Sequence, residues 1–412
     1  MRKIAAILIC FGFPLLLTAQ TSTKMMVYNL LNFPGSTPER ESYFKTVMRH
    51  EAPDLLMVCE LQDATGADAL LAQFNSIWPG KYSRAMYVDG PGTDNMLYYN
   101  HFKFGISKQA EVTTNIRWIS HFKVYFKDVN LNATSDTVQM NLFMAHLKAS
   151  SGSSNETERE GQAQDLMNYI ATNTNEENII FGGDFNIYEH VEPAFQIFIN
   201  DASNPLFDPI NEIGSWHNNN SYESIHTQST RTTSFGGGVP GGMDDRFDMI
   251  LINNDFNTGI HDVSYIPGTY NNPGNDGNHF DQSIVEGAAN NSVPDSVLQA
   301  LWQMSDHLPV VMKISANVIL SGTSIPSMGR ANFSSLLTAT DGSIYLKINK
   351  QLSANNVMIN IVAPNGQLIN SAEYTNTHQT IALKTNSLPR GLYLVRIFNG
   401  DELLDRHKMI VR

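Results

Sequence analysis

Residues 179–186, IIFGGDFN, join an apolar strand to a polar loop. Its apolar start runs into Gly182 and Gly183, and a glycine pair allows a tight backbone path and the close approach of a ligand. Asp184 and Asn186 stand two residues apart, so an extended backbone points both side chains the same way. An Asx turn would use the same residues. We favour a functional strand end, because it offers a charged acceptor beside an amide donor.

The rest of residues 24–314 alternates strand-like and helix-like segments. Strands followed by helices and by hairpin-like returns predict a layered α/β sandwich, and the nearly continuous apolar runs indicate strands buried on both faces. The expected strands are residues 25–27, 55–58, 96–99, 138–145, 178–181, 247–252 and 310–314. The expected helices, with apolar residues at helical spacing, are residues 40–50, 66–75 and 159–172.

Polar side chains follow or interrupt several of these strands. Glu60 comes after an apolar run, where a carboxylate is costly unless it is paired or metal-bound; a salt-bridged core edge is an equal alternative. Asp248 lies inside an apolar strand and needs a partner, for which a catalytic histidine is a candidate. Taken alone, Asn29 fits a strand-end cap and His146 fits a structural histidine. Together these residues predict a polar site at the strand ends.

Most of the candidate metal-ligand atoms of these residues are oxygen atoms. The sequence has no Gly-x-Ser-x-Gly elbow, no His-Glu-x-x-His pair, no Cys-x-x-Cys and no phosphate-binding Gly-Lys-Ser/Thr loop. Carboxylates and amides favour Mg²⁺, with Mn²⁺ or Ca²⁺ as alternatives. The formal net charge of −13 argues against a generally basic surface that grips polyanions, although a bound cation can supply local positive charge.

The two ends of the chain differ from the middle. Residues 1–20 read as a signal peptide, with two basic residues, an apolar run and a small-residue end. After its removal only Cys59 remains, which excludes an internal disulfide. We expect residues 21–316 to form the main domain, residues 317–340 a linker and residues 341–412 a small all-β sandwich, with a tight turn at residues 364–366. We also expect a monomer with no stable membrane insertion.

The middle of the chain resembles the endonuclease/exonuclease/phosphatase superfamily, to which deoxyribonuclease I belongs. The resemblance covers about residues 24–314, and its motifs occur in the family order. They are residues 28–30, residues 59–61, His146, residues 183–186, residues 246–248 and residues 305–307. It implies a four-layer α/β/β/α sandwich with its site at one end of two packed sheets, and a metal-dependent hydrolase.

The resemblance also implies the roles of individual residues. Glu60 would be the principal metal ligand with Asn29 beside it, and Asp306 would support the metal or the histidine. Asp184 and Asn186 would orient or activate water and hold the phosphoryl group.

Proton transfer is implied for the histidines. His307 would act in proton transfer or contact the phosphate, with Asp248 fixing its ring. His146 would bind phosphate or serve as an acid, but residues 96–100 contain no acidic partner for it, so the leaving-group acid stays open. Lys148, Arg231 and Tyr98 are candidates for substrate contacts.

The tail resembles the type IX secretion sorting domain of Bacteroidetes, on the segments at residues 387–397 and 408–412. The resemblance implies recognition by the export machinery and a secreted or cell-surface protein. A carbohydrate-binding or adhesion module is the alternative.

These features predict a secreted, metal-dependent phosphodiester hydrolase, most of all an endonuclease that cleaves DNA or RNA by water attack. A phosphodiesterase or phosphatase on small or lipid phosphate esters is the alternative. For lipid substrates we would expect an aromatic membrane-docking pair, whereas the tryptophans are scattered at Trp78, Trp118, Trp216 and Trp302. A non-catalytic adhesion protein is a third reading, although none of the principal site residues is missing.

Overall fold

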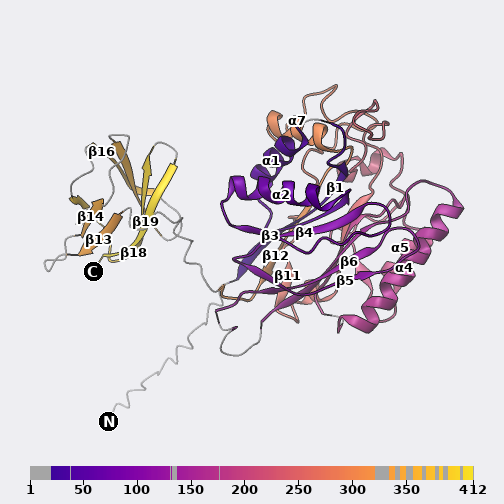
Figure 1. Cartoon of the computed structure of the whole chain (residues 1–412), viewed down its shortest axis with the longest axis horizontal. Coiled ribbons are helices and arrows are strands. Elements are labelled where there is room, and N and C mark those ends of the chain that lie inside the picture. The colour runs from indigo at the N-terminus through magenta and orange to yellow at the C-terminus, as the bar shows by residue number, and fades with distance from the viewer. Residues whose placement is uncertain are drawn as a thin grey trace, which may run out of the picture. The chain divides into compact units, whose positions relative to one another are not determined.

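The computed structural model comprises two compact units, residues Met1–Ser321 and Gly322–Arg412 (Figure 1). It describes residues 20–37, 39–129, 131, 137–175, 177–320, 334–338, 344–348, 356–363, 368–375, 380–383, 388–399 and 402–411. The expected signal peptide up to residue 19, most of the expected linker and the expected turn at residues 364–366 lie outside the described residues.

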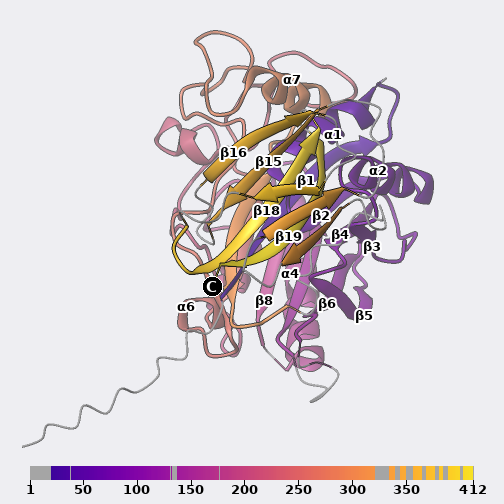
Figure 2. The ribbon, with the colours of Figure 1, turned by 90° about the vertical axis from the view of Figure 1, so that its left-hand side faces the viewer.

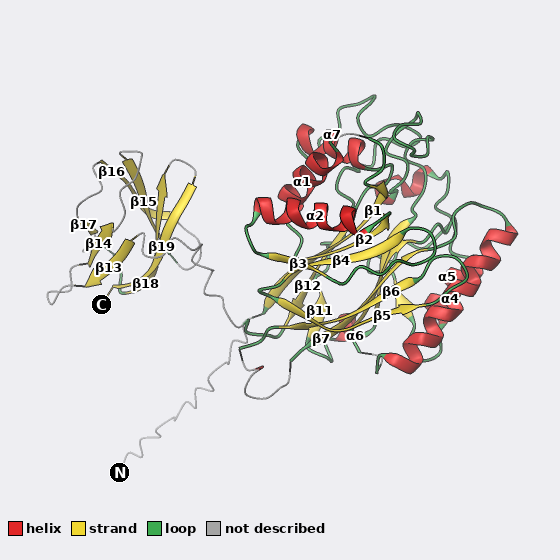
Figure 3. Ribbon diagram, in the orientation of Figure 1, coloured by secondary structure: helices red, strands yellow, loops and turns green. Residues whose placement is uncertain are grey.

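The first sheet of the larger unit has the order β11-β12-β1-β2-β4-β3. Its strands are β1 (Thr21–Phe33), β2 (Leu55–Leu61), β3 (Tyr82–Arg84), β4 (Asp94–Asn100), β11 (Val263–Tyr265) and β12 (Val310–Ala316). Helices α1 (Arg40–Glu51), α2 (Ala64–Ile77) and α7 (Asp295–Met304) cover its outer face (Figure 3). β1 runs parallel to β2 and antiparallel to β12, so the end of β1 lies beside the end of β2 and the start of β12.

The second sheet has the order β5-β6-β7-β8-β10-β9. Its strands are β5 (Phe104–Val112), β6 (Ile119–Phe126), β7 (Gln139–His146), β8 (Ile179–Asp184), β9 (Leu206–Phe207) and β10 (Asp248–Asn253). Helices α4 (Ser153–Asn173) and α5 (Pro193–Asn200) cover its outer face (Figure 1). Two short helices, η1 (Asn220–Ile225) and α6 (Asp255–Thr258), lie in the connections.

The two sheets pack face to face through a core to which β1, β2, β7, β8 and β10 all contribute. Gly182 lies at this contact, where an added Cβ would come within 2.7 Å of Val27 Cγ2. Gly183 adopts φ +151°, and a Cβ there would lie 1.9 Å from the carbonyl oxygen of Ala145, so this position requires glycine. Helices, two sheets and helices form the expected α/β/β/α sandwich, which is confirmed. Gly182 allows the two sheets to approach, whereas Gly183 makes room for the neighbouring strand β7.

The smaller unit is all-β over its described residues, as expected. One sheet contains β13 (Ser334–Thr338), β14 (Ile344–Ile348) and β17 (Thr380–Leu383). The other has the order β16-β15-β18-β19, with β15 (Asn356–Val362), β16 (Leu368–Thr375), β18 (Gly391–Asn399) and β19 (Glu402–Val411), seen side by side in Figure 2. β13 falls inside the segment expected to be a linker and pairs with β14, so the sandwich begins before residue 341.

Within the described part of the chain, no helix is long and apolar enough to cross a membrane.

Candidate active site

Three neighbouring strands of the second sheet bring a histidine and two aspartates into one row. His146, at the end of β7, pairs in register with Asp184, at the end of the parallel strand β8. Asp248, at the start of the antiparallel strand β10, pairs with Asp184 from the other side. All three side chains are buried. Strand ends separated by up to a hundred residues of sequence therefore meet at one edge of the sandwich.

The first sheet contributes an irregular backbone to the same edge. The β1–β2 register shifts after Asn29, and Leu31, Asn32 and Glu60 adopt φ values of 44°, 50° and 59°. Such left-handed conformations are costly for residues other than glycine and are held only by their surroundings. Here the Asn32 N–H donates to Glu60 Oε2 at 2.8 Å, and the Arg40 guanidinium donates to the Leu31 carbonyl at 3.0 Å. This bulge turns the Glu60 carboxylate toward the second sheet.

Asn29 connects the two sheets. Its amide nitrogen donates to Glu60 Oε1 and to Asp184 Oδ2, both at 2.9 Å. Its Oδ1 accepts the Leu31 N–H at 2.9 Å. His146 lies against the same two carboxylates, with Nδ1 3.7 Å from Glu60 Oε1 and Nε2 3.6 Å from Asp184 Oδ2. Four polar side chains thus converge at the point where the sheets meet.

His307 faces this group from the loop before β12. Its Nδ1 lies 2.7 Å from Asp248 Oδ2, which confirms the expected pairing of the buried acid with a histidine. Its Nε2 lies 2.6 Å from the side-chain nitrogen of Gln228 and 3.7 Å from Asp184 Oδ2. Burial lowers the pKa of His307, but the Asp248 and Asp184 carboxylates outweigh it and hold that pKa well above the usual range.

The electrostatics of the other members follow from burial. Desolvation, with the Asp248 and Glu60 charges, raises the pKa of Asp184 to about 7, although His307 opposes the shift. Burial, with the charges of Arg117 and His307, lowers the pKa of His146 well below its usual range, so its ring is neutral at neutral pH. The site therefore pairs a protonated histidine with a neutral one across a carboxylate of elevated pKa.

The donor set fits a divalent cation. Glu60, His146 and Asp184 each offer one ligand atom, and these atoms all lie within 4.8 Å of one another. Three buried atoms around the site, His146 Nδ1, Asp248 Oδ1 and Asp306 Oδ1, have no hydrogen-bond partner. Burying a carboxylate or an imidazole without a partner costs free energy, and a bound cation would offset this cost for the ligand atoms that face it.

The expected site residues are largely assembled around one cleft of about 500 Å³. Glu60, His146, Asp184, Asn186, Asp306 and His307 line it, and Asn29 and Asp248 lie directly behind. The Asn186 N–H donates to Asp184 Oδ1 at 3.1 Å. Asp306 is tied to the opposite wall, because its Oδ2 accepts the Val239 N–H at 2.7 Å, and it stands apart from the Glu60–His146–Asp184 group.

The three candidates for substrate contact do not line the cleft. Tyr98 is fully buried beneath α2, and its hydroxyl donates to the Ala67 carbonyl at 3.0 Å. Arg231 is buried between the rings of Phe235 and Trp302 and donates to main-chain carbonyls of both residues. Lys148 donates to the Ala149 carbonyl at 2.8 Å. We leave Tyr98 and Arg231 out of the site, because the interior already engages their polar atoms. Lys148 is half-buried and its ammonium has three N–H donors, so its role as a substrate contact stays a prediction.

The structure adds residues that the sequence did not single out. Gln228 bridges His307 and Asp306 from the loop after η1, with its side-chain nitrogen 3.4 Å from Asp306 Oδ2. At the rim, His217 lies 2.7 Å from Asp245, and Asp244 completes a second group able to hold a metal ion. The Asp-Asp pair directly before the Arg-Phe-Asp motif was the available signal for this rim. No local pattern marked Gln228.

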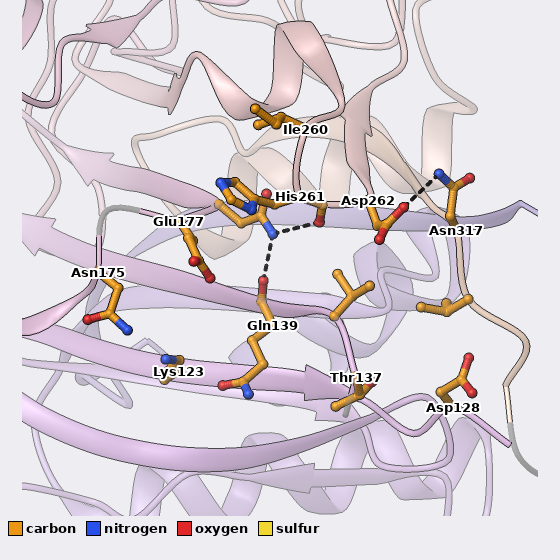
Figure 4. A pocket seen from close by; sticks show the side chains of 13 residues that line it. Lys123, Asp128, Thr137, Gln139, Asn175, Glu177, Ile260, His261, Asp262 and Asn317 are labelled. Carbon is orange, nitrogen blue, oxygen red and sulfur yellow. Dashed lines mark hydrogen bonds between the residues drawn. The ribbon is translucent and has the colours of Figure 1, made fainter. Parts of the chain in front are cut away.

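A second hollow of about 580 Å³ lies at the opposite end of the same sheet, where β7 and β8 begin (Figure 4). Its polar groups mostly satisfy one another. Asn178 donates from its amide to the carbonyls of Gln139 and His261 at 2.8 and 3.1 Å, and Asn317 donates to Asp262 at 3.1 Å. Among its described residues no group able to hold a metal ion is found.

Comparison with known proteins identifies both units. The endonuclease/exonuclease/phosphatase family model matches residues 26–307, more than half of the chain, so the chain belongs to this family. Members of the family are phosphoester hydrolases, typically dependent on a divalent metal. The model of the secretion system C-terminal sorting domain matches residues 340–412, which marks the chain for type IX secretion, to the cell surface or the medium. No curated protein matches the chain.

Several solved structures align with this chain at low sequence identity. Zebrafish (D. rerio) TDP2 complexed with a single-strand DNA product has a TM-score of 0.48 at 14% identity, over 71% of this chain and 99% of that one. An endonuclease/exonuclease/phosphatase from Bacteroides vulgatus has a TM-score of 0.45 at 12% identity, over 72% and 99%. The human Nocturnin catalytic domain with bound sulfate has a TM-score of 0.43 at 16% identity, over 72% and 94%.

Proposed function

We propose that the chain is an exported, divalent-metal-dependent phosphodiesterase, and that its substrate is the backbone of DNA or RNA. One observation carries the proposal. His307, fixed by Asp248, places Nε2 3.7 Å from the Asp184 carboxylate in a cleft that Glu60 and His146 also line, and the neighbouring carboxylates hold the pKa of His307 well above its usual range. A cationic donor opposite a carboxylate of elevated pKa is the pairing that water attack on a phosphodiester requires.

The residues of this chain suggest a division of labour. Asp184, with a pKa of about 7, accepts a proton from the attacking water, and the Asn186 N–H at 3.1 Å fixes the orientation of its carboxylate. His307 donates from Nε2 to a phosphoryl oxygen, which takes the place of the Gln228 amide. Glu60 and His146 belong to the group that would hold the metal. When bound, a divalent cation supplies positive charge to the phosphoryl oxygens.

A second candidate substrate is a small phosphodiester. The described residues that line the cleft include no lysine or arginine, whereas the acids among them are Glu60, Asp184, Asp244, Asp245 and Asp306. A long polyanion usually gains affinity from basic side chains that contact its phosphates. The acidic lining therefore favours a substrate with few charges unless bound cations offset it.

A substrate panel tests the proposal. We expect the full-length protein with Mg²⁺ or Mn²⁺ to nick plasmid DNA and to hydrolyse bis-p-nitrophenyl phosphate but not the monoester. EDTA and Asp184→Ala should abolish both activities, whereas Asp262→Asn, a carboxylate at the second hollow, should leave them unchanged. Cleavage of the small diester without nicking of DNA or RNA would favour the second candidate. Full activity of Asp184→Ala, or of the EDTA-treated protein, would overturn the proposed mechanism.

A further inference from the structure

We propose that Arg40 and Arg231 are positioning residues of the active site, which hold the end of helix α7 and thereby place His307. Both guanidinium groups are buried, although they come from distant parts of the chain. Neither residue is among the described residues that line the cleft, so both would act through the main chain that they bind. The inference rests on the proposed function, because it names residues that the proposed reaction needs without contact with the substrate.

The last turn of α7 has carbonyl oxygens that the helix itself cannot satisfy, because the last four carbonyls of an α-helix lack N–H partners within it. α7 has no basic residue in this turn. Instead, the Arg40 guanidinium donates to the Met304 carbonyl at 2.6 Å, and the Arg231 guanidinium donates to the Trp302 carbonyl. The helix dipole also favours cations at this end. Two distant segments of the chain thus supply the cations at the end of α7.

Arg40 joins the end of α7 to the irregular end of β1. Its guanidinium donates to the carbonyls of Leu31 at 3.0 Å and Pro34 at 3.1 Å, and also to the carbonyl of Leu30. This is the segment whose bulge turns the Glu60 carboxylate toward the second sheet. One side chain therefore fixes the end of β1 to the loop that follows α7.

Arg231 joins the same helix end to the loop that precedes β10. Its guanidinium donates to the Phe235 carbonyl at 2.8 Å and lies 5.3 Å from the ring centres of both Phe235 and Trp302, which stack on one another. The adjacent Thr230 hydroxyl donates to the Ser305 carbonyl at 2.8 Å. The residue directly after α7 is therefore held from this side as well.

Ser305 connects the end of α7 to the polar groups of the cleft. Its hydroxyl donates to the Asn29 carbonyl at 2.8 Å and accepts the His307 N–H at 3.1 Å. Asn29 in turn donates from its amide to the carboxylates of Glu60 and Asp184. A shift of the α7 end would therefore move His307 relative to both carboxylates. A misplacement of about 1 Å caused far from the chemistry can lower a rate about 10²-fold.

Steady-state kinetics of the full-length variants Arg40→Lys and Arg231→Lys tests the assignment. Lysine keeps the positive charge, but its single ammonium group cannot bind together the carbonyls that the guanidinium fork joins. We expect kcat for bis-p-nitrophenyl phosphate to fall by about 10–100-fold in each variant, with KM close to the wild-type value. Arg84→Lys is the matched control, because Arg84 lies in the first sheet and donates to the Ala85 carbonyl at 2.9 Å. It should keep wild-type kinetics.

A double-mutant cycle separates positioning from a purely structural role. If Arg40 acts through His307, Arg40→Lys should cause little further loss of kcat/KM once His307→Gln has removed the group that Arg40 places. A loss of stability alone would lower activity by the same factor in both backgrounds. Ser305→Ala cuts the connection without changing either arginine, so it should also lower kcat, and it tests the inference even if an arginine variant does not fold.

The outcomes separate this inference from the proposed function. Equal losses from Arg40→Lys in the wild-type and His307→Gln backgrounds, or a wild-type kcat in Ser305→Ala, would overturn the positioning role and leave the proposed function intact. A raised KM with an unchanged kcat in the arginine variants would assign these residues to substrate binding and overturn the positioning role as well. A wild-type protein that cleaves no phosphodiester would remove both proposals.

Discussion

The two ends of the β7–β8 sheet are both hollowed, and they differ in chemistry rather than in size. The cleft at the carboxyl ends measures about 500 Å³ and the hollow at the opposite end about 580 Å³. At the cleft, the buried atoms without partners belong to the ionisable side chains His146, Asp248 and Asp306. At the opposite end, the corresponding atom among the described residues is an amide oxygen, Oδ1 of Asn178.

The volume of a hollow therefore does not identify the active site. A cluster of buried ionisable side chains identifies it. Placing Asp184 and Asp248 beside one another costs desolvation and repulsion, and the pKa of about 7 for Asp184 reflects that cost. An end of a sheet that has only a structural role gains nothing that would offset the cost of such a pair of carboxylates. Substitution of matched residues at the two ends can therefore test whether the contrast is functional.

The largest difference in activity between substitutions at the two ends is expected for the histidines. His307→Ala should lower kcat/KM for bis-p-nitrophenyl phosphate by about 10²–10⁴-fold, the range of general acid–base contributions. His261→Ala, at the opposite hollow, should leave kcat/KM unchanged. Steady-state kinetics of the purified full-length variants measures both. A comparable loss in His261→Ala would show that the two ends are not functionally distinct.

A smaller loss is expected for the acid that orients the ring. Asp248→Asn removes the charge opposite His307 but keeps an oxygen that can accept the Nδ1 proton. Hydrogen bonds to charged groups contribute about 1.5–3 kcal/mol, so we expect a loss of about 10–150-fold in kcat/KM.

Its matched control is Asp255→Asn, near the opposite end, where Asp255 accepts the Asn178 N–H at 2.7 Å. We expect wild-type kinetics from this control. Wild-type kinetics from Asp248→Asn as well would mean that the charge on Asp248 has no part in the reaction.

Much of the fold was readable from the sequence because its strands are short apolar runs with clear ends. The strands and helices expected around β1, β2, β4, β7, β8, β10, β12, α1, α2 and α4 are present, and α4 begins at Ser153, six residues before its expected start. β5 and β6 were not predicted, because half-buried lysines interrupt their apolar pattern. β13 was read as linker because its short segment follows a Ser/Gly-rich stretch.

The site was readable in part, for a physical reason. Asp248 needs a partner whatever the fold, so burial alone predicts a histidine beside it, and the family resemblance implies that this histidine is His307. The left-handed backbone conformation of Glu60 could not be predicted, because no glycine marks the position and hydrogen bonds from other segments impose the conformation. Arg231 lies in a polar stretch that predicts a substrate contact, but in the structure it is buried and donates to the carbonyls of the nearby Phe235 and the distant Trp302. Such long-range partners leave no local trace in a sequence.

Substitution of Gln228 should lower kcat/KM modestly, and a matched substitution at the opposite hollow should not. Gln228→Ala removes the amide that lies 2.6 Å from His307 Nε2. A typical intramolecular hydrogen bond contributes about 0.5–1.5 kcal/mol net, so we expect a change in kcat/KM of about 2–12-fold. Gln139→Ala, at the opposite hollow, is the matched control and should not change the kinetics. If Gln228→Ala matched the loss in His307→Ala, Gln228 would have to act on the substrate itself.

Substitution of Asn178 should not change catalysis. It should lower the stability of the folded protein instead. Asn178→Ala removes donors to the carbonyls of Gln139 and His261 and places alanine at φ 47°, a region that asparagine tolerates better. Leaving buried carbonyls unsatisfied costs about 1–3 kcal/mol. Urea unfolding should therefore show a lower midpoint with an unchanged slope, while kcat/KM of the folded protein stays at the wild-type value. A variant that kept its stability but lost activity would assign a function to the opposite end and break the contrast between the two.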